Sequence, residues 1–580
     1  MKVLLLQPED AFAAFGSIRA WDVIVDLGRA PAATYEGWKR KANCPVISLY
    51  DFAREFEDLH HVRRLLQFGM SQWMDGSGID WWDVLSLMIS EELLQLILVG
   101  RLATELGTGC DLYSSRPSLE SRALQSLLRG TLNNLGSPLG SLRHRARHYY
   151  CAFSQLEVAQ LAQIFEDKFD PEHTIRRWLT PRRPTSGQPV VLLPSAYVNV
   201  SRMGIAYARL LPDQQFLLVR ARRIGELGPL PRNLRVTSLD GYFIARDGRE
   251  IESLVQGWKP LKEKLVSAAE EFSIANAVGV LDRVPALLPW GVAARNAWNQ
   301  VLESENVIAC LCADDTNPYT RIPLILAKKR GLPGLACHHG ALDFRMAMKT
   351  RYADVYLAKS EMERDYLVRA CQIPPEEVVV ASPFLESGLP NSDLSPAGRP
   401  WLVFFTEPFS GAGWRDQEVY RDLLPRLLSL AKNSGLKLVF KLHPFESVKG
   451  VRNLLRRLLT SEEECQIAVT KEPMSRERWQ KVLFAMTVES SVALECHALG
   501  IPVFLCSWLR NPHGAYMRQY GRFGIGHLLE HPDQIADIPQ LLKLVGRPSS
   551  GTLGQSLSAE KLCQLFLGVH RTRTASKASL

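Results

Sequence analysis

A lysine and a histidine follow a short apolar segment late in the chain, in the sequence Lys441-Leu442-His443-Pro444. The apolar residues 436–440 before them are typical of a buried strand. We therefore expect these polar groups at the carboxyl edge of a sheet, where ligands bind in open α/β folds. Pro444 should end the strand ladder and hold the loop. His443 is thus a candidate phosphate ligand, although a structural loop histidine is the commoner explanation for this dipeptide alone.

A second polar segment, Thr487 to Glu495, follows another apolar segment and opens a predicted helix. The first N–H groups of a helix favour an anion. Ser490 or Ser491 is the expected N-cap, and Gly500 stands where a helix end favours glycine. A well-capped helix would explain these residues but not Glu495, which shares a helix face with Ser491. We expect the serines to bind phosphate and Glu495 to bind ribose hydroxyls, as suits a sugar nucleotide.

Two polar segments follow predicted strands in the middle of the chain. In His338-His339-Gly340 the glycine permits a tight turn, so that one histidine would face the crevice. A histidine can act as a general base near neutral pH. In the segment 314–317 one aspartate could orient that histidine or act as the base itself, or Asp315, Thr316 or Asn317 could simply be the N-cap of the next helix. The catalytic candidates are therefore His339, Asp315 and His338.

Weaker candidates lie after other predicted strands. Thr406 begins a glycine-containing loop whose N–H groups could approach a phosphate. Residues 195–199 could contact an acceptor, whereas Lys359 is expected to be a solvent-exposed lysine. We expect no metal, because no acidic residue or cysteine lies at a ligand-like spacing from the histidines. The expected donor-binding residues are His443, Pro444, Ser490, Ser491, Glu495, Thr406 and Thr487.

Apolar strand segments alternate with helical segments, which predicts an α/β fold with parallel sheets. An α/β accessory region is expected over residues 1–185, unless it forms part of the next domain. Two Rossmann-like domains are expected over residues 186–395 and 396–546, facing each other across a cleft, and residues 547–580 should form a helix and a flexible tail. The expected strands are 2–7, 22–27, 45–50 and 110–114 in the first region, 190–194, 215–219, 307–312, 334–338, 355–358 and 378–381 in the second, and 401–405, 436–440, 467–470, 482–486 and 502–506 in the third.

The composition is that of a soluble globular protein, with 46% hydrophobic and 22% charged residues among 580. The net charge of +8 is compatible with an ordinary basic surface, an acidic substrate or an anionic membrane face. Nucleic acid is not indicated, because no recognition motif accompanies the charge. The 11 cysteines are scattered, which favours a reducing compartment. The first apolar run is too short for a signal peptide, and residues 84–100 contain Glu91 and Glu92, so a buried helix is expected there.

These motifs resemble those of GT-B-fold glycosyltransferases of bacterial surface polysaccharides: a strand, Lys-Leu-His-Pro, a second strand, Ser-Ser, and a helix bearing Glu before Gly-x-Pro. The similar families are the capsule Kdo transferases, the bacterial sialyl- and polysialyltransferases and the CDP-glycerol polymerases of teichoic acid synthesis. The resemblance covers residues 188–545. Ala381-Ser382-Pro383 departs from the Gly-Asn-Pro that the polymerases often carry, and two adjacent histidines leave the acting one open.

The resemblance implies a metal-independent glycosyltransferase without a cofactor, which moves a sugar from a nucleotide sugar, often CMP-linked, to a polysaccharide or glycolipid of the capsule or cell envelope. It implies that the donor phosphate is held by His443, Ser490 and Ser491, the ribose by Glu495, and that the base is His339 or Asp315. The alternatives are a CDP-glycerol-type polyol-phosphate transferase, a nucleotide-sugar 2-epimerase and a non-catalytic sugar-nucleotide-binding protein. The expected partners are a nucleotide sugar and a glycan or lipid-linked glycan. The expected location is the cytoplasm, with peripheral attachment to the inner face of the plasma membrane left open.

Overall fold

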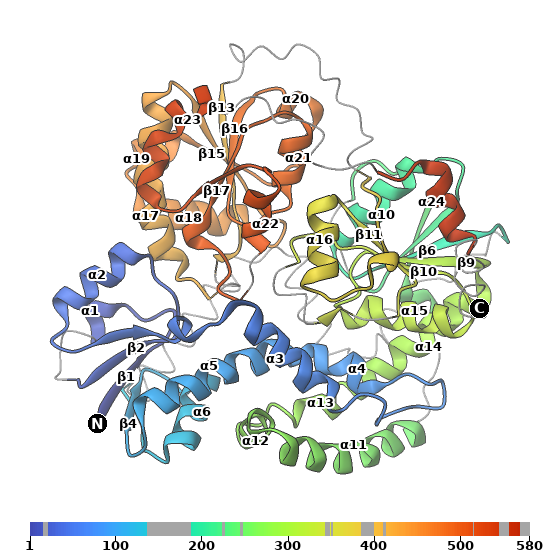
Figure 1. Cartoon of the computed structure of the whole chain (residues 1–580), viewed down its shortest axis with the longest axis horizontal. Helices are drawn as coiled ribbons and strands as arrows, with labels where there is room; N and C mark the ends of the chain where they lie inside the picture. Colours follow the sequence, from blue (N-terminus) through green and yellow to red (C-terminus); the bar gives the residue numbers. More distant parts are fainter. Residues whose placement is uncertain are drawn as a thin grey trace.

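The fold is built from three parallel sheets, each in its own part of the chain (Figure 1). The computed structural model describes residues 1–15, 21–135, 187–222, 227–243, 248–342, 348–349, 352–383, 400–409, 413–513, 516–544 and 556–568. The domain boundaries predicted near residues 185, 395 and 546 fall between these ranges and stay predictions. We call the three described parts the accessory region (1–135), the N-lobe (187–383) and the C-lobe (400–544).

The accessory region has a five-stranded sheet in the order β3-β2-β1-β4-β5. All four strands expected from the sequence are present, and β5 is an additional edge strand. The apolar segment β1 pairs in parallel with both β2 and β4, and all of its residues after Lys2 are buried. The strands are β1 (Lys2–Leu6), β2 (Val23–Asp26), β3 (Val46–Ser48), β4 (Asp111–Ser114) and β5 (Leu132–Asn134).

The apolar segment expected to be a buried helix belongs to α4 (Trp81–Leu85), a short 3₁₀ turn and α5 (Ser90–Leu106). Most of the apolar residues of α5 are buried, and Trp81 and Trp82 are fully buried. Among the described helices, none combines the length and apolar composition needed to cross a bilayer. The other helices of the region are α1 (Phe12–Phe15), α2 (Ala32–Lys41), α3 (Glu55–Gln67) and α6 (Leu119–Leu128).

The N-lobe has a seven-stranded sheet in the order β12-β11-β10-β9-β6-β7-β8. Apart from the edge strand β8, its strands are mostly apolar and buried, as expected for a parallel sheet covered on both faces. The sequence missed β8, which lies at the edge. The strands are β6 (Val190–Ser195), β7 (Phe216–Arg220), β8 (Leu234–Ser238), β9 (Val307–Cys312), β10 (Gly334–Ala336), β11 (Val355–Ala358) and β12 (Val378–Val380).

A helical layer joins the accessory region to the N-lobe (Figure 1). Trp82 of α4 packs on Trp258 of α11 and on Phe272 of α12, with ring centroids 5.9 Å apart in both pairs. The two parts therefore share one apolar core, although each has its own sheet. The N-lobe helices are α10 (Val198–Leu210), α11 (Gly248–Ala268), α12 (Glu270–Ala277), α13 (Arg283–Ala286), α14 (Leu288–Ser304), α15 (Pro318–Lys329) and α16 (Glu361–Arg369).

The C-lobe has a six-stranded sheet in the order β15-β14-β13-β16-β17-β18. Five strands agree with the sequence prediction, and β18 is another unpredicted edge strand. The strands are β13 (Trp401–Phe405), β14 (Lys437–Lys441), β15 (Ile467–Thr470), β16 (Val482–Thr487), β17 (Val503–Cys506) and β18 (His527–Leu529). The helices are α17 (Asp416–Asn433), α18 (Val448–Leu458), α19 (Ser461–Cys465), α20 (Arg476–Trp479), α21 (Val492–Ala498), α22 (Tyr516–Arg522) and α23 (Ile538–Leu544).

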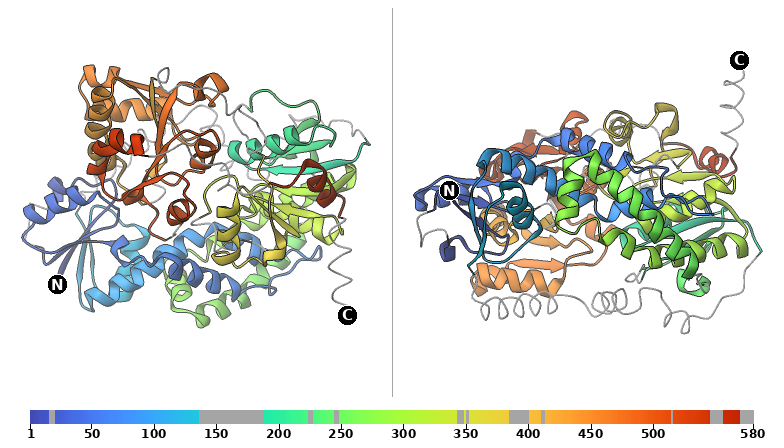
Figure 2. Two further views of the ribbon diagram at one scale, coloured as in Figure 1. Left: turned by 45° about the horizontal axis from the view of Figure 1, so that its top comes forward. Right: turned by 90° about the horizontal axis from the view of Figure 1, so that it is seen from below.

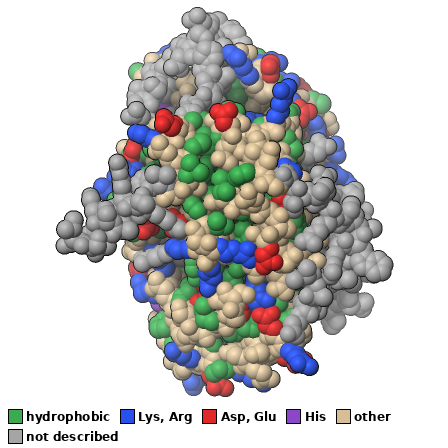
Figure 3. Space-filling view, turned by 90° about the vertical axis from the view of Figure 1, so that its right-hand side faces the viewer, with side chains coloured by type: hydrophobic (Ala, Val, Ile, Leu, Met, Phe, Trp, Pro, Cys, Tyr) green, Lys and Arg blue, Asp and Glu red, His purple; other side chains and the backbone are tan. Residues whose placement is uncertain are grey.

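The last described helix, α24 (Ala559–Phe566), returns to the N-lobe (Figure 2). Phe566 packs on Phe216 of β7 with ring centroids 6.2 Å apart, and the Leu557 N–H donates to the Val380 carbonyl at 2.8 Å. The face in Figure 3 carries both acidic and basic side chains, with basic ones gathered across its middle. Two parallel α/β lobes that face a common cavity, with an N-terminal α/β accessory region, confirm the predicted two-domain Rossmann-like arrangement.

Candidate active site

A cavity of about 900 Å³ lies between the lobes, and all three parts of the chain line it. The carboxyl ends of the strands in both lobe sheets face this cavity, which explains why residues far apart in sequence meet there. Three of the residues predicted from the sequence do not line it: His338, Asp315 and Thr487. Those that do are His339, Thr406, His443, Pro444, Ser490, Ser491 and Glu495.

His443 follows β14 and is held by its own backbone. Its N–H donates to Glu446 Oε2 at 2.9 Å and to the Thr406 hydroxyl at 3.2 Å. The Phe445 N–H donates to His443 Nδ1 at 3.3 Å, so the ring proton resides on Nε2. Burial, His339 and the neighbouring cationic side chains together lower the pKa of His443 to about 4, with burial the largest cause. His443 is therefore a neutral imidazole near pH 7 that can donate one hydrogen bond.

Two cationic side chains from different lobes lie near His443. Burial and the charge of Arg202, among others, lower the pKa of Lys441 to about 8. Burial likewise lowers the pKa of Arg202, which projects from α10 of the N-lobe, and Glu495 opposes this shift. Cations held together without full solvation favour a bound anion, because it offsets their mutual repulsion. The sequence contained no spacing signal for Arg202, since it lies inside a helix of the opposite lobe.

The two serines lie where the sequence predicted, just before α21. The Ser490 hydroxyl accepts from the Val492 N–H at 3.4 Å, and Ser491 is the N-cap. Because α21 has only seven residues, its dipole contributes little to anion binding. An anion at this position would be bound mainly by the serine hydroxyls and backbone N–H groups. Burial raises the pKa of Glu495 to about 7, while Lys359, Lys441 and Arg202 oppose the shift. Glu495 can therefore accept or donate a hydrogen bond near neutral pH.

Thr487 is fully buried and positions a loop rather than a ligand. Its hydroxyl lies 3.3 Å from Glu407 Oε1, which also accepts from the Glu489 N–H at 2.8 Å. Thr406 lines the cavity and donates to Glu446, the same carboxylate that accepts from the His443 N–H. The two threonines therefore order the loops after β16 and β13.

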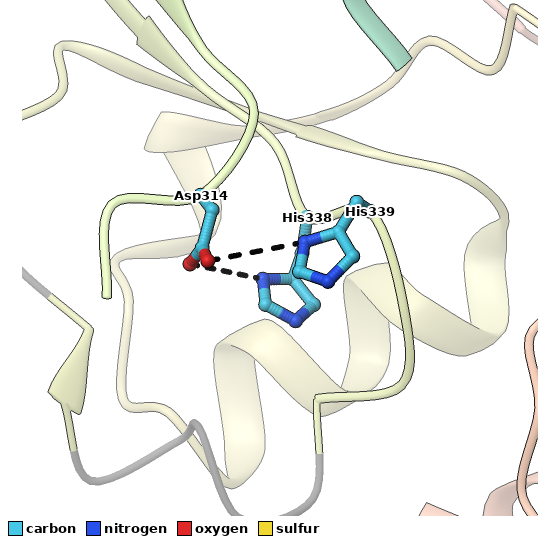
Figure 4. Close-up of side chains that lie close together, drawn as sticks. All are labelled: Asp314, His338 and His339. Atoms are coloured by element: carbon cyan, nitrogen blue, oxygen red, sulfur yellow. Dashed lines mark ion pairs between the residues drawn. The ribbon is translucent and has the colours of Figure 1, made fainter. Parts of the chain in front are cut away.

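The second half of the site follows three neighbouring N-lobe strands, β10, β9 and β6. His339, Asp314 and Tyr197 come after these strands in that order. Asp314 points towards both histidines (Figure 4), with Oδ1 3.8 Å from His338 Nδ1 and Oδ2 4.0 Å from His339 Nδ1. Tyr197 donates to Asp314 and lies 3.3 Å from His339 Nε2. The side chain of His339 is 15% exposed and that of His338 only 2%, so His339 is the histidine available to a substrate.

Asp315, the aspartate predicted to assist catalysis, is fully buried in the N-lobe instead. It pairs with Lys349 Nζ at 2.5 Å and accepts from the Tyr356 hydroxyl at 3.2 Å. The carboxylate raises the pKa of Lys349 against the opposing effect of burial. The aspartate beside the histidines is its neighbour Asp314, while Asn317 caps the following helix. The structure therefore places Asp314, and not the catalytic candidate Asp315, beside the histidines.

Lys359 is buried, contrary to the expected solvent-exposed position. Its ammonium donates to the carbonyls of His338 and Gly340, both at 2.8 Å, and pairs with Glu363 at 3.0 Å. This lysine therefore holds the histidine loop in the shape that presents His339.

The ligating atoms of Asp314, His338 and His339 lie within 4.8 Å of one another, a donor set that a divalent metal could use. The sequence spacing did not reveal that Asp314 lies close to the histidines, because Asp314 follows β9 and the histidines follow β10. Asp314 also accepts hydrogen bonds from Tyr197 and from the Thr316 N–H, which fits an orienting carboxylate.

Phe445 and Tyr197 form a contact between the lobes, with ring centroids 5.7 Å apart. Phe445 also packs on His443 at 5.0 Å, and Tyr197 on His339 at 5.0 Å. The two histidines therefore lie at opposite ends of one chain of aromatic contacts. The sequence pointed to residues 195–199 only as a possible acceptor contact, and nothing in it singled out Phe445.

No family model and no curated protein sequence matches this chain. It is similar to the solved structure of UDP-GlcNAc 2-epimerase from Methanocaldococcus jannaschii, with 11% identity over 65% of this chain and 98% of that chain and a TM-score of 0.39. It is also similar to the wall teichoic acid polymerase TagF, with 10% identity, 72% and 97% coverage and a TM-score of 0.39. A third similar structure is the lipopolysaccharide outer core galactosyltransferase WaaB, with 12% identity, 68% and 100% coverage and a TM-score of 0.35.

Proposed function

We propose that this protein transfers a glycosyl group from a nucleotide sugar to an acceptor hydroxyl in the cavity between the lobes. The observation that carries the proposal is the pairing of two half-sites across one cavity. A cationic, phosphate-type half-site contains His443, Lys441 and the serines before α21, and His339 with Asp314 faces it from the N-lobe. A binding protein without catalytic activity would not need the oriented histidine opposite the phosphate site.

In this reaction the acceptor hydroxyl loses its proton to the imidazole of His339. The acceptor oxygen then bonds to the anomeric carbon as the bond from that carbon to the donor phosphate breaks. Asp314 stabilises the imidazolium that forms, and Tyr197 holds Asp314 in place. The electron pair of the broken bond stays on the phosphate, where Lys441, Arg202 and the Nε2–H of His443 stabilise the charge.

The resemblance described above favours CMP as the nucleotide and a cell-envelope glycan, free or lipid-linked, as the acceptor. These cationic groups can neutralise a phosphate, so we propose that transfer needs no metal. Transfer that persists with EDTA present would support metal independence, and loss of transfer restored by a divalent cation would assign the ion to the Asp314 cluster.

The first experiment is a thermal-shift panel of CMP, CDP, UDP, GDP and dTDP. A nucleotide that binds the native state raises its melting temperature. One nucleotide should stabilise the wild type clearly more than the others and should not stabilise His443→Ala. No stabilisation by any nucleotide would contradict a donor site at this position.

A further inference from the structure

The accessory region supplies one end of the cavity. Tyr50 and Gln95 line the cavity from this region, and His513 lines it from the segment after β17. In the C-lobe sheet, β13 and β16 separate β17 from β14, the strand that precedes His443. The cavity wall therefore runs from the phosphate-type half-site to a second polar cluster built jointly by the accessory region and the C-lobe.

His513 is buried and oriented by a carboxylate of the accessory region. Its Nδ1 lies 3.3 Å from Asp58 Oδ2. Burial alone would raise the pKa of Asp58, but hydrogen bonds from His513 and Arg101 lower it, so the group is a carboxylate. In the neutral imidazole, this carboxylate places the ring proton on Nδ1 and leaves a lone pair on Nε2. Within the described part of the chain, His513 Nε2 is buried without a hydrogen-bond partner.

Gln95 presents a second acceptor of the same kind. Its Nε2 donates to the Tyr50 hydroxyl at 3.2 Å, which fixes the amide. Its Oε1 is buried and has no hydrogen-bond partner among the described residues. An unsatisfied buried acceptor is costly, and a ligand that donates to it removes that cost. Glu91, one turn earlier on α5, adds an exposed carboxylate to the same wall.

These groups select for a neutral ligand rich in hydrogen-bond donors. The Gln95 carbonyl, the His513 lone pair and the Glu91 carboxylate all accept hydrogen bonds, and Glu91 would repel a phosphate. Tyr50 and the neighbouring leucines add apolar and aromatic surface to the same wall. Hydroxyl donors on a partly apolar ring are the chemistry of a sugar.

We propose that this end of the cavity, the hydroxyl subsite of Tyr50, Glu91, Gln95 and His513, binds a glycosyl residue through its hydroxyls. The inference rests on the proposed function, because it assigns this end of the cavity to a sugar that takes part in the glycosyl transfer. The donor phosphate would bind at the other end, beside His443. That sugar comes either from the acceptor glycan or from the donor, and the two sources are experimentally separable.

The test uses saturation-transfer NMR on the full chain with a panel of methyl glycosides of the common hexoses and N-acetylhexosamines. At least one glycoside should receive saturation from the wild type. Gln95→Leu should weaken its binding about fivefold, the effect of one hydrogen bond, and His513→Phe should do the same. Gln67→Leu, at an exposed position on α3 outside the cavity, is the matched control and should not change binding. Unchanged melting temperatures would show that the variants fold.

A second arm compares UDP with UDP-glucose and CMP with CMP-sialic acid. A donor sugar in the subsite makes a nucleotide sugar bind more tightly than its nucleotide. If Gln95→Leu reduces only this difference in affinity, the subsite holds the donor sugar. If it weakens only free glycosides, the subsite holds the acceptor. Failure of every glycoside and both nucleotide sugars to bind, or equal binding by Gln95→Leu and Gln67→Leu, would overturn the proposal. Glycoside binding is measured without nucleotide and in His443→Ala as well, so a failed phosphate site does not affect this result.

Discussion

Arg415 of the C-lobe and Asp26 of the accessory region form a buried ion pair that fixes one part on the other. The Arg415 guanidinium Nε donates to Asp26 Oδ1 at 2.9 Å, and its other nitrogens donate to the carbonyls of Gln7, Pro8 and Asp10. A second pair, Asp83 with Arg321 at 2.9 Å, joins the accessory region to the N-lobe. The accessory region therefore bridges both lobes, and any closure of the cleft must preserve or reorganise these contacts.

Removing the guanidinium should be costly, because it leaves Asp26 charged and buried. Arg415→Ala should lower the free energy of unfolding by about 3–5 kcal/mol, as for other buried pairs that lose one partner. Arg421→Ala, which breaks the exposed pair with Glu418, should cost about 0–1 kcal/mol. Urea denaturation of both variants measures the difference, and similar losses would argue against a docking role for Arg415.

His443 should contribute to nucleotide binding through one hydrogen bond to a charged phosphate. His443→Ala should therefore weaken nucleotide affinity roughly 10- to 100-fold at an unchanged melting temperature. The control is His531→Ala. That histidine follows β18, is exposed to solvent and does not line the cavity. Isothermal titration with the nucleotide found by thermal shift gives both values. Equal affinities for the two variants would remove His443 from the donor site.

The α/β architecture could be predicted because buried parallel strands are runs of apolar residues. The strands that were missed, β5, β8 and β18, each lie at the edge of a sheet and are only partly buried. Their sequences, such as Leu132–Asn134, contain polar residues that an exposed edge tolerates. The other three edge strands, β3, β12 and β15, were predicted, because their sequences are mostly apolar. The hydrophobic pattern therefore finds the apolar strands and misses only the edge strands that carry polar residues or are very short.

The position of His443 and the two serines in the cavity wall was predictable, because they directly follow apolar strands. The rest depends on tertiary contacts. Asp314 and Asp315 are adjacent in sequence, and only the path of the loop decides which one meets the histidines and which one meets Lys349. Arg202 comes from a helix of the other lobe, so no local pattern could connect it with Lys441.

The adjacent aspartates should separate catalysis from stability. Asp314→Asn should lower kcat roughly 10²-fold, because the amide no longer stabilises the imidazolium of His339. Asp315→Asn should instead lower the free energy of unfolding by about 3–5 kcal/mol, since it leaves Lys349 charged and buried. Each variant serves as the control for the other, with kcat measured well below the melting temperature. A larger loss of kcat in folded Asp315→Asn than in Asp314→Asn would restore the role predicted from the sequence.

Nucleotide affinity should fall as the pH rises, because the groups around the phosphate lose protons. The pKa of Lys441 is lowered to about 8, so its positive charge is present below pH 8 and is lost above it. The pKa of Glu495 is raised to about 7, so a negative charge appears beside the same phosphate above pH 7. Phosphate binding favours the protonated form of both groups, and affinity should drop up to tenfold per pH unit above pH 8.

Lys441→Arg should flatten the step near pH 8, because its guanidinium stays charged, and Glu495→Gln should remove the step near pH 7. The nucleotide affinity of both variants is compared with that of the wild type between pH 6 and about pH 9.5, so that titration of the nucleotide itself cancels. A step near pH 8 that persists in Lys441→Arg would exclude Lys441 as its source.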